Sequence, residues 1–278
     1  QTYFAHLSTM TAMTLKIVAA AVVPLVLCTG PVSTFLSGKL ASLRGALLWR
    51  YFLFQLFRLW RLPAGPELEH QGRHLLILGS SVAKGEGAEA GPAPNLGWPQ
   101  RLDRALQERS NVWRTHLRAV EYTTSQLWYE LVIKKTTPEE WKHFSVVVIS
   151  LSVNNEGFTL TDDARKLNEI KEHFLKHMRL TTTELRRRLA PEARLVLAGP
   201  YANNGYTLKH LDVVHEIKKE MSQWQEVSYF IDLMQEDACD LKGHWPSGFS
   251  RDPAHPNSLG HEGLFKCLDL PAIFGDLW

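Results

Sequence analysis

Three side chains that together can activate a hydroxyl group occur in two short segments of this chain. Ser81 follows an apolar run, and Asp252 and His255 stand three residues apart near the other end of the sequence. A serine hydroxyl is a weak nucleophile at neutral pH, so it needs a base within reach and a third group that holds this base in the right tautomer. In a tight loop, which Pro253 and Pro256 favour, the carboxylate can bind one ring nitrogen while the other faces the serine. We therefore predict a catalytic triad with Ser81 as the serine nucleophile, His255 as the base and Asp252 as the orienting group.

The segments that must position these residues alternate between short apolar runs and helical stretches. Strands that alternate with helices favour an α/β fold, in which helices cover both faces of a parallel sheet. Ser81 then follows the first predicted strand. The predicted strands are 74–78, 116–120, 145–151, 194–199 and 227–233, and the predicted helices are 99–109, 162–189 and 208–225.

Three segments resemble sequence blocks of the SGNH (GDSL-type) hydrolases, and they occur in the order that this family has. Gly79-Ser80-Ser81 resembles the Gly-Asp-Ser block that carries the nucleophile. The segment 146–155 (Val-Val-Val-Ile-Ser-Leu-Ser-Val-Asn-Asn) resembles the family's strand followed by Gly-x-Asn-Asp. The segment 252–261 (Asp-Pro-Ala-His-Pro-Asn-Ser-Leu-Gly-His) resembles the closing Asp-x-x-His block and is the most specific of the three. The resemblance covers roughly residues 73 to 268.

The resemblance implies the SGNH hydrolase fold, a flavodoxin-like three-layer sandwich with a five-stranded parallel sheet. In its strand order, 2-1-3-4-5, the first and third strands are neighbours, and ligands bind at the carboxyl ends of the strands where the order reverses. Ser81 follows the first predicted strand and Asn154 follows the third. These two residues should therefore meet at that switch point.

The resemblance also implies which groups donate to the oxyanion that forms when an ester carbonyl is attacked. The first Asn of the Gly-x-Asn-Asp block is the side-chain donor, which is Asn154 here, or Asn155 if the register shifts by one residue. The backbone N–H of Ser81 is a second donor. A third is the backbone N–H of a residue that is normally Gly, and Glu121 takes this position in the segment 119–124.

Four positions depart from the family pattern. Ser80 replaces an Asp beside the nucleophile, and Asn155 replaces the Asp of the Gly-x-Asn-Asp block, whereas Ser152 and Glu121 replace glycines. A backbone N–H survives any side chain except proline, but the close approach that Gly permits does not always survive. The two replaced glycines therefore keep open an interpretation in which the site binds a ligand without catalysis.

Motifs of three other kinds of site occur in or near the same segments, but each of them is incomplete. Ser81-Val-Ala-Lys84 matches the Ser-x-x-Lys motif of penicillin-binding enzymes, but no Ser-Asp-Asn or Lys-Thr-Gly motif follows. The glycine-rich segment after the first strand lacks the Gly-Lys-Ser/Thr ending of a phosphate loop. The spacing of His244, His255 and His261 fits no metalloprotease pattern, so we predict neither a metal site nor a cofactor. We expect His244 in a loop and His261 in the first turn of the last helix.

The composition is that of a folded domain and does not distinguish among enzymes. A chain of 278 residues with 45% apolar residues and nine Trp can bury one sizeable core plus an appendage. The formal charge of +2, from 31 basic and 29 acidic residues, gives no reason to expect nucleic acid as a partner. Three cysteines are too few for a disulfide framework, and Cys239 and Cys267 either pair or remain free buried thiols.

The N-terminal part differs from the rest and is predicted to contain a signal peptide or a membrane anchor. Residues 1–37 contain an uncharged stretch, 17–36, of which only 17–28 is strongly apolar. This length suits the core of a signal peptide better than a spanning helix. A cleaved signal peptide and a signal anchor would place the following domain in opposite compartments. We therefore expect a protein of the secretory pathway or a membrane-associated one, and both topologies stay open.

Residues 38–66 are predicted to form a basic amphipathic helix followed by a Pro/Gly linker, before a catalytic domain at 67–278. Over 43–61 four arginines share one sector of the helix, and leucines, phenylalanines and tryptophans fill the other. Such a helix suits the surface of a membrane. The alternative is a helix packed on its own catalytic domain. The linker is Pro63-Ala-Gly-Pro66.

Together these features predict a membrane-associated serine esterase of the SGNH type. It would cleave the carboxylic ester of a small molecule, a lipid or a sugar through an acyl-enzyme intermediate. One alternative keeps the same site but transfers the acyl group to a sugar or lipid alcohol. Another is a non-catalytic, membrane-bound binding module. The sequence leaves the acyl group, the alcohol and the oligomeric state open.

Overall fold

The computed structural model describes residues 72–278. The predicted signal peptide or anchor at 1–37, the basic helix and linker at 38–66, and the boundary of the catalytic domain at 67 lie outside the described residues. Within 72–278, no helix is both long enough and apolar enough to cross a membrane.

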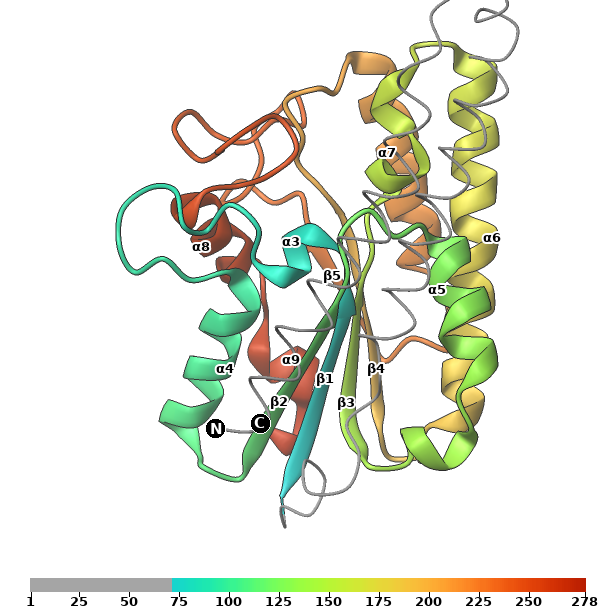
Figure 1. The fold of residues 1–278 in the computed structure, drawn as a ribbon, viewed down its shortest axis with the longest axis vertical. Coiled ribbons are helices and arrows are strands. Elements are labelled where there is room, and N and C mark those ends of the chain that lie inside the picture. The colour runs from blue at the N-terminus through green and yellow to red at the C-terminus, as the bar shows by residue number, and fades with distance from the viewer. Residues whose placement is uncertain (1–71) are drawn as a thin grey trace, which may run out of the picture. The chain divides into compact units, whose positions relative to one another are not determined.

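Five parallel strands form a single sheet at the centre of the described residues (Figure 1). Their order is β2-β1-β3-β4-β5, and every neighbouring pair is parallel. This is the flavodoxin-like order that the resemblance implied, so the predicted fold class is confirmed. The strands are β1 (Arg73–Gly79), β2 (Trp113–Ala119), β3 (Phe144–Ser150), β4 (Arg194–Tyr201) and β5 (Tyr229–Leu233).

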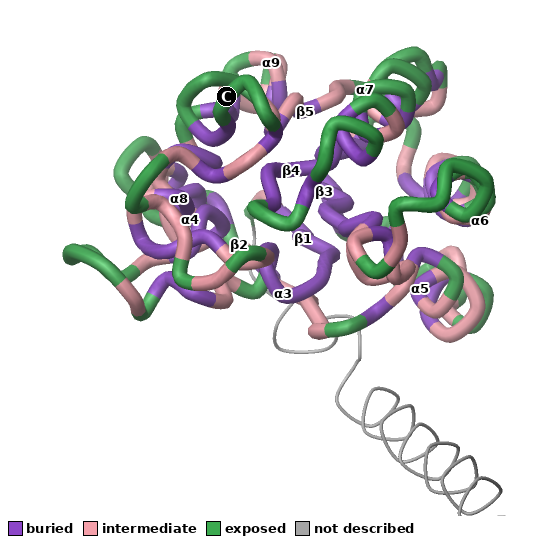
Figure 2. Tube along the Cα trace, turned by 90° about the horizontal axis from the view of Figure 1, so that it is seen from above, coloured by how far each residue is buried: buried purple, intermediate pink, exposed green. Residues whose placement is uncertain are grey.

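Helices cover both faces of the sheet and complete the three layers, with α4, α8 and α9 on one side and α5, α6 and α7 on the other (Figure 2). The short helix α3 follows β1 at the carboxyl end of the sheet (Figure 1). The α-helices are α3 (Ser81–Lys84), α4 (Trp98–Arg109), α5 (Ser125–Leu131), α6 (Ala164–Arg188), α7 (Leu208–Met221), α8 (Ser258–Lys266) and α9 (Leu270–Phe274). The 3-10 helices are η3 (Ile133–Lys135), η4 (Pro138–Trp141), η5 (Val153–Glu156), η6 (Phe158–Leu160) and η7 (Gly275–Leu277).

The three central strands, β1, β3 and β4, are buried along almost their whole length because each face of the sheet packs on a layer of helices, whereas the edge strands β2 and β5 are only partly buried. Successive side chains of a strand point to opposite faces. In β3, Val147 and Ile149 therefore belong to the core beneath α5, α6 and α7, whereas Val146 and Val148 belong to the core beneath α4 and α8. The sheet is thus buried on both sides, and polar groups that serve a site must lie at its ends.

Capping side chains fix the ends of the helices that border the carboxyl end of the sheet. Asp163 accepts a hydrogen bond from the Lys166 N–H at the start of α6. Asn257 accepts from the N–H groups of Leu259 and Gly260 at the start of α8. The N-cap of α8 comes only two residues after His255, so it also fixes the end of the loop that carries this side chain.

Candidate active site

A sharp turn between β1 and α3 places Ser81 at the carboxyl end of the sheet. Gly79 permits this turn: a Cβ atom there would lie 2.2 Å from the Cβ of Ala83 and 2.7 Å from the carbonyl oxygen of Ser150 in β3. Any larger residue would therefore push α3 and β3 away from β1. Ser81 is the first residue of α3, and it is buried except for 9% of its surface.

The structure brings Ser81, His255 and Asp252 together in one chain of hydrogen bonds. The Nε2 atom of His255 lies 3.1 Å from the Oγ atom of Ser81. Its Nδ1 atom lies 2.9 Å and 3.0 Å from the two carboxylate oxygens of Asp252. Because an ionised carboxylate can only accept, Nδ1 donates to Asp252, and the neutral imidazole then accepts the Ser81 hydroxyl at Nε2.

The loop between Asp252 and His255 is closed by the Asp252 side chain itself. Its Oδ1 atom accepts from the backbone N–H of Ala254 at 2.9 Å and from that of His255 at 3.0 Å. Such Asx-type turns are a local property of aspartate. They explain why a spacing of three residues is enough to bring the carboxylate under the imidazole ring.

The environment keeps Asp252 ionised. Burial acts to raise the pKa of Asp252, but hydrogen bonds from His255, from the Ala254 N–H and from Arg251 together outweigh it. The pKa of this carboxyl group therefore lies below its ordinary value. At neutral pH the group is a hydrogen-bond acceptor for the imidazole.

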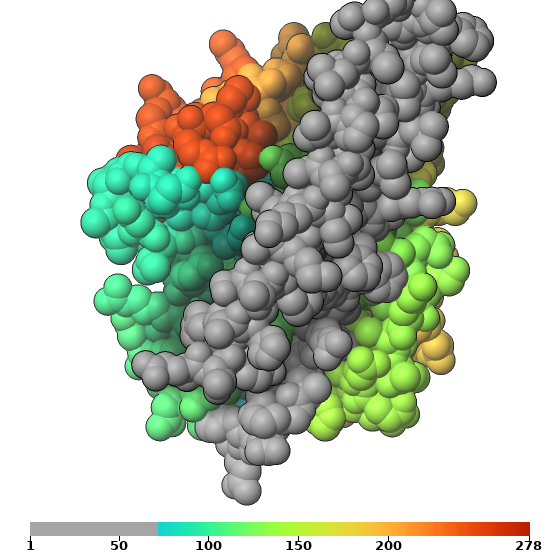
Figure 3. Space-filling view, viewed as in Figure 1, coloured from blue at the N-terminus to red at the C-terminus, as the bar shows by residue number. Residues whose placement is uncertain are grey.

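Arg251 joins the loop that carries the triad residues to the loop that follows α3. Its Nε and Nη2 atoms donate to Asp252 Oδ2 at 3.1 Å and 3.0 Å. Its Nη1 atom donates to Glu86 at 2.7 Å and to Glu89 at 2.6 Å. On the surface, the teal loop after α3 lies against the orange-red loop near the C-terminus (Figure 3). Sequence reasoning did not single out Arg251, although it stands directly before Asp252.

His261 lies in the first turn of a helix, as predicted, although this helix is α8 and not the last one, α9. From the inside it contacts the loop after α3. It is fully buried, its Nδ1 atom accepts from the Trp98 N–H at 3.4 Å, and its Nε2 atom donates to the Glu86 carbonyl at 3.0 Å. Burial lowers the pKa of His261 to about 4, so the ring is neutral at neutral pH. Both ring nitrogens of His261 make hydrogen bonds to backbone groups, so the residue has a structural role beside the site.

The two candidate oxyanion asparagines have different partners. The Asn155 Nδ2 atom donates to the Thr123 carbonyl at 2.9 Å. The Asn154 Oδ1 atom accepts from the Tyr206 hydroxyl at 3.1 Å, whereas its Nδ2 atom is buried and has no hydrogen-bond partner among the described residues. A buried donor without a partner costs free energy, so it is available to an acceptor that arrives with the substrate. Ser152, which replaces a Gly of the family, accepts from the Asn154 backbone N–H at 3.2 Å.

The segment after β2 lies beside the start of α3. The Val120 N–H donates to the Gly79 carbonyl at 3.0 Å, and the Lys84 ammonium donates to the Glu121 carboxylate at 2.5 Å. Lys84 is therefore paired with Glu121, and the side chain within hydrogen-bond distance of Ser81 Oγ is that of His255. Tyr122 is the only non-glycine residue with a positive φ among residues 72–278, at 58°. The backbone conformation that favours Gly thus occurs at Tyr122, one residue after Glu121.

The two cysteines and His244 were also considered in the sequence. Cys239 and Cys267 are both free and buried, and burial raises the pKa of each thiol to about 12, so neither is a thiolate at neutral pH. His244 lies in a loop, as predicted, where its Nε2 atom donates to the Tyr206 carbonyl at 2.9 Å. Among residues 72–278, no three His, Cys, Asp or Glu side chains are grouped so that they could hold a metal ion.

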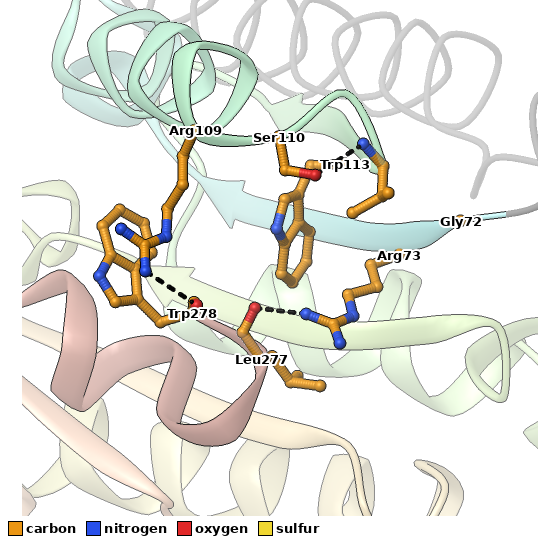
Figure 4. Close-up of a pocket in the computed structure, with 8 residues that line it drawn as sticks. Gly72, Arg73, Arg109, Ser110, Trp113, Leu277 and Trp278 are labelled. Atoms are coloured by element: carbon orange, nitrogen blue, oxygen red, sulfur yellow. Dashed lines mark hydrogen bonds between the residues drawn. The ribbon is translucent and has the colours of Figure 1, made fainter.

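A cavity of about 740 Å³ lies away from these residues, where β1 and β2 begin. Arg109 stacks over the Trp278 ring at 4.3 Å and donates to its carbonyl oxygen, and Arg73 lies over the Trp113 ring at 5.8 Å (Figure 4). None of the predicted site residues lines this cavity. In open parallel sheets ligands bind at the carboxyl ends of the strands, and this cavity lies at the other end.

Solved structures of other proteins share the fold. A lipase from a goat rumen metagenome, Lip_vut3, is similar over 74% of this chain and 100% of its own, with a TM-score of 0.59 and 18% sequence identity. TesA matches over 74% of this chain and 100% of its own, with a TM-score of 0.52 and 15% identity. LAE5, an α/β hydrolase enzyme from the metagenome of Lake Arreo in Spain, matches over 76% of this chain and 99% of its own, with a TM-score of 0.50 and 17% identity.

The family itself is identified by sequence. No curated protein matches the chain significantly. The model of the GDSL-like lipase/acylhydrolase family matches residues 77–262, which is more than half of the chain and includes Ser81, Asn154, Asp252 and His255. The chain therefore belongs to the GDSL-like lipase/acylhydrolase family and is a hydrolase of carboxylic esters.

Proposed function

We propose that this hydrolase cleaves esters by nucleophilic catalysis, with Ser81 as the nucleophile. The observation that carries the proposal is the chain of hydrogen bonds from Ser81 Oγ through His255 to Asp252, at 3.1 Å and 2.9 Å. Ser81 attacks the ester carbonyl while His255 Nε2 takes the hydroxyl proton. Asp252 holds the imidazole in the required tautomer and stabilises the imidazolium that forms.

The reaction then proceeds in two halves through a covalent intermediate. The tetrahedral adduct on Ser81 collapses, the C–O bond to the alcohol breaks, and His255 gives its proton to the leaving oxygen. This leaves an acyl-enzyme ester on Ser81. Water then attacks this ester as His255 takes one of its protons, and the collapse releases the carboxylic acid and restores the Ser81 hydroxyl.

The oxyanion of both tetrahedral states needs donors at the same place. We assign this role to the Nδ2 atom of Asn154, to the backbone N–H of Ser81 and to a backbone N–H of the segment Glu121–Tyr122. In support, the Asn154 Nδ2 atom has no partner among the described residues. The Ser81 N–H lies in the first turn of α3, where it has no acceptor within the helix.

The non-catalytic alternative rested on the side chains that replace two glycines. In the structure Glu121 pairs with Lys84, and Ser152 accepts from the Asn154 backbone N–H. Both side chains thus have structural partners, and the alignment of Ser81 with His255 is kept. This favours the enzyme over the binding module. Transfer of the acyl group to a sugar or lipid alcohol would use the same steps, with the alcohol in place of water.

Labelling with a fluorophosphonate tests the nucleophile directly, because only an activated serine reacts. We expect the wild-type protein to be labelled at Ser81, and Ser81→Ala and His255→Ala to lose about 10⁵- to 10⁶-fold in kcat for a simple ester. Thermal melting provides the control for folding. Near-normal ester hydrolysis by purified, folded Ser81→Ala protein would contradict the proposal. Products formed with and without an added alcohol separate hydrolysis from transfer.

The location of the enzyme is a separate proposal that rests on the sequence of the N-terminal part. We propose that the basic amphipathic segment 43–61 attaches the enzyme to a membrane surface, on either side of a bilayer or within the secretory pathway. The segment lies outside the described residues. Its arginines and its broad aromatic face support the proposal.

A further inference from the structure

The buried hydroxyl of Tyr206 contacts Asn154, the side chain that we propose as a hydrogen-bond donor to the oxyanion. Tyr206 lies in the loop between β4 and α7 and is only 5% exposed. Its hydroxyl donates to Asn154 Oδ1 at 3.1 Å across 52 residues of sequence. No motif in the sequence pointed to this residue.

The contact matters because an asparagine amide has two unlike ends. The NH₂ end can donate to an oxyanion, whereas the carbonyl end would repel it. A rotation of the amide plane by half a turn exchanges the two ends with little change in shape. In the rotated state, the Tyr206 hydroxyl would face an NH₂ group and lose the acceptor that Oδ1 provides.

Neighbouring residues hold Tyr206 in this position. Its ring stacks on His210, with centroids 6.0 Å apart and planes at 15°, and meets the Phe158 ring edge-on at 5.9 Å. His210 is itself fixed, because its Nε2 atom donates to the Phe158 carbonyl at 3.1 Å. The His244 side chain donates to the Tyr206 backbone carbonyl at 2.9 Å. Burial also raises the pKa of Tyr206 far above its ordinary value, so the hydroxyl keeps its proton and stays a donor.

We infer that Tyr206 is a positioning residue that holds the Asn154 amide with its NH₂ group directed to the oxyanion. The inference rests on the proposed function of Ser81 and Asn154. In this assignment Tyr206 acts through the Asn154 amide and not on the reacting atoms. It acts by keeping the donor in one orientation before the transition state forms, so that no reorientation is needed during the reaction.

The test is Tyr206→Phe in the full chain, which removes one oxygen atom and keeps the ring. We expect kcat for a simple ester to fall about 10-fold with KM little changed, because the oriented donor acts mainly in the transition state. Tyr229→Phe is the matched control. Tyr229 is a partly buried tyrosine at the start of β5, whereas Ser81 lies at the carboxyl end of the sheet. Tyr229→Phe should keep wild-type kcat. A normal kcat for folded Tyr206→Phe, or a loss confined to KM, would overturn the inference.

A double-mutant cycle with Asn154→Ala separates orientation from general packing. Once the amide is absent, Tyr206→Phe has nothing to orient, so the double variant should have the same kcat as Asn154→Ala alone. A further fall of similar size would overturn the inference. This comparison also decides the case if Tyr206→Phe alone is unstable, because the double variant leaves no unpaired acceptor at Asn154.

The same experiments keep the inference separate from the function on which it rests. If Ser81→Ala retains activity, the proposed function fails and the inference fails with it. If Ser81→Ala is inactive while Tyr206→Phe turns over normally, the proposed function stands and only the inference is overturned. If Asn154→Ala also turns over normally, the nucleophile stands, but the oxyanion role of Asn154 is overturned together with the inference.

Discussion

Asn154 and Asn155 are adjacent and chemically identical, yet they occupy different environments. They lie in the 3-10 helix η5, in which neighbouring side chains point about 120° apart. One amide therefore points to Tyr206 and keeps a free donor, while the other donates to the Thr123 carbonyl. The sequence ranked Asn154 first and Asn155 second, because a shift of one residue would place Asn155 and Glu156 in the Asn and Asp positions of the family block.

The two variants should fail in different ways. Asn154→Ala should lower kcat by about 10² to 10³ with little change in KM, as expected for an oxyanion donor. Asn155→Ala should instead lower the free energy of unfolding by about 1–2 kcal/mol, because the Thr123 carbonyl loses its partner. Steady-state kinetics and urea unfolding of both variants make the comparison. If the kinetic loss appears in Asn155→Ala and not in Asn154→Ala, the assignment is wrong by one residue.

The parts of the site that sequence reasoning found are those that local geometry or a family block defines. Asp252 and His255 are joined by an Asx turn that needs only a short segment. Tyr206 and Asn154 meet across 52 residues, and nothing near Tyr206 in the sequence indicates an orienting hydroxyl. The left-handed backbone at Tyr122 was also missed, since tyrosine is not a residue that signals a positive φ.

Among the elements, β1, β3 and β4 were predictable because each contains a buried apolar run. The edge strands β2 and β5 are only partly buried, yet all five observed strands begin or end within three residues of the predictions. The order of the strands does not follow from the runs and came from the family resemblance. Helix α5 was missed because its seven residues are too few for a clear helical period. Its start is marked only by Thr124, which accepts from the Leu127 N–H.

Two loops at the carboxyl end of the sheet depend on Arg251, so its loss should affect catalysis through Asp252. Without the guanidinium, Asp252 Oδ2 loses its two contacts with Arg251 and keeps only the one with His255 Nδ1, and Glu86 loses its partner across the loops. We expect Arg251→Ala to lower kcat/KM about 3- to 10-fold, because the carboxylate beneath His255 is less well fixed. Arg251→Lys should recover part of this loss, since an ammonium can hold one partner but not the whole fork.

The matched control for Arg251 is Arg104→Ala, on α4. Arg104 pairs only with Glu108 on an exposed helix face, and both side chains are 65% exposed. Its removal should leave kcat/KM unchanged, because an exposed ion pair contributes little to the stability of the fold and Arg104 does not contact Asp252. Equal kcat/KM values for Arg251→Ala and Arg104→Ala would show that the contact with Asp252 does not support the reaction.

A carboxyl group near the end of α6, that of Glu184, should make the stability of the fold depend on pH. Glu184 accepts from Arg187 at 2.5 Å and from the buried Arg188 at 2.8 Å, and these arginines lower its pKa to about 2. A carboxyl whose pKa is lowered in the folded state stabilises the fold above its unfolded pKa, about 4.5, and this contribution is lost as the pH falls toward 2. Glu184→Gln should therefore cost about 1–2 kcal/mol at pH 7, after allowance for solvent screening, and little at pH 2.

Urea unfolding at both pH values measures this difference, and Glu139→Gln is the control. Glu139 is an exposed carboxylate that pairs with Lys142 at 3.6 Å, with both side chains at least 60% exposed. Glu139→Gln should therefore show no comparable loss in the free energy of unfolding at pH 7. A Glu184→Gln penalty that is as large at pH 2 as at pH 7 would mean that the charge of Glu184 is not its source.

In the enzyme that we propose, the catalytic fold and the N-terminal sequence have separate roles. Residues 72–278 contain the complete set of predicted site residues and no helix able to cross a bilayer. Our proposal places the attachment to a membrane in the first 66 residues. The basic segment 43–61 is the best candidate, because aromatic side chains and arginines together suit a lipid headgroup region.

A protein that begins at Gly38 should consequently sediment with vesicles that contain anionic lipid. Each arginine near the surface contributes about 1 kcal/mol, and the apolar face adds binding that salt does not screen, so high salt should weaken the association only in part. Replacing Trp49, Phe52, Leu56 and Trp60 with Ser should release the protein, and a protein that begins at residue 68 should not bind. Ester hydrolysis measured in the supernatant and the pellet shows where the active enzyme is. If the protein from Gly38 is active but stays in the supernatant, the segment does not bind anionic bilayers, and the alternative of a helix packed on its own domain is favoured.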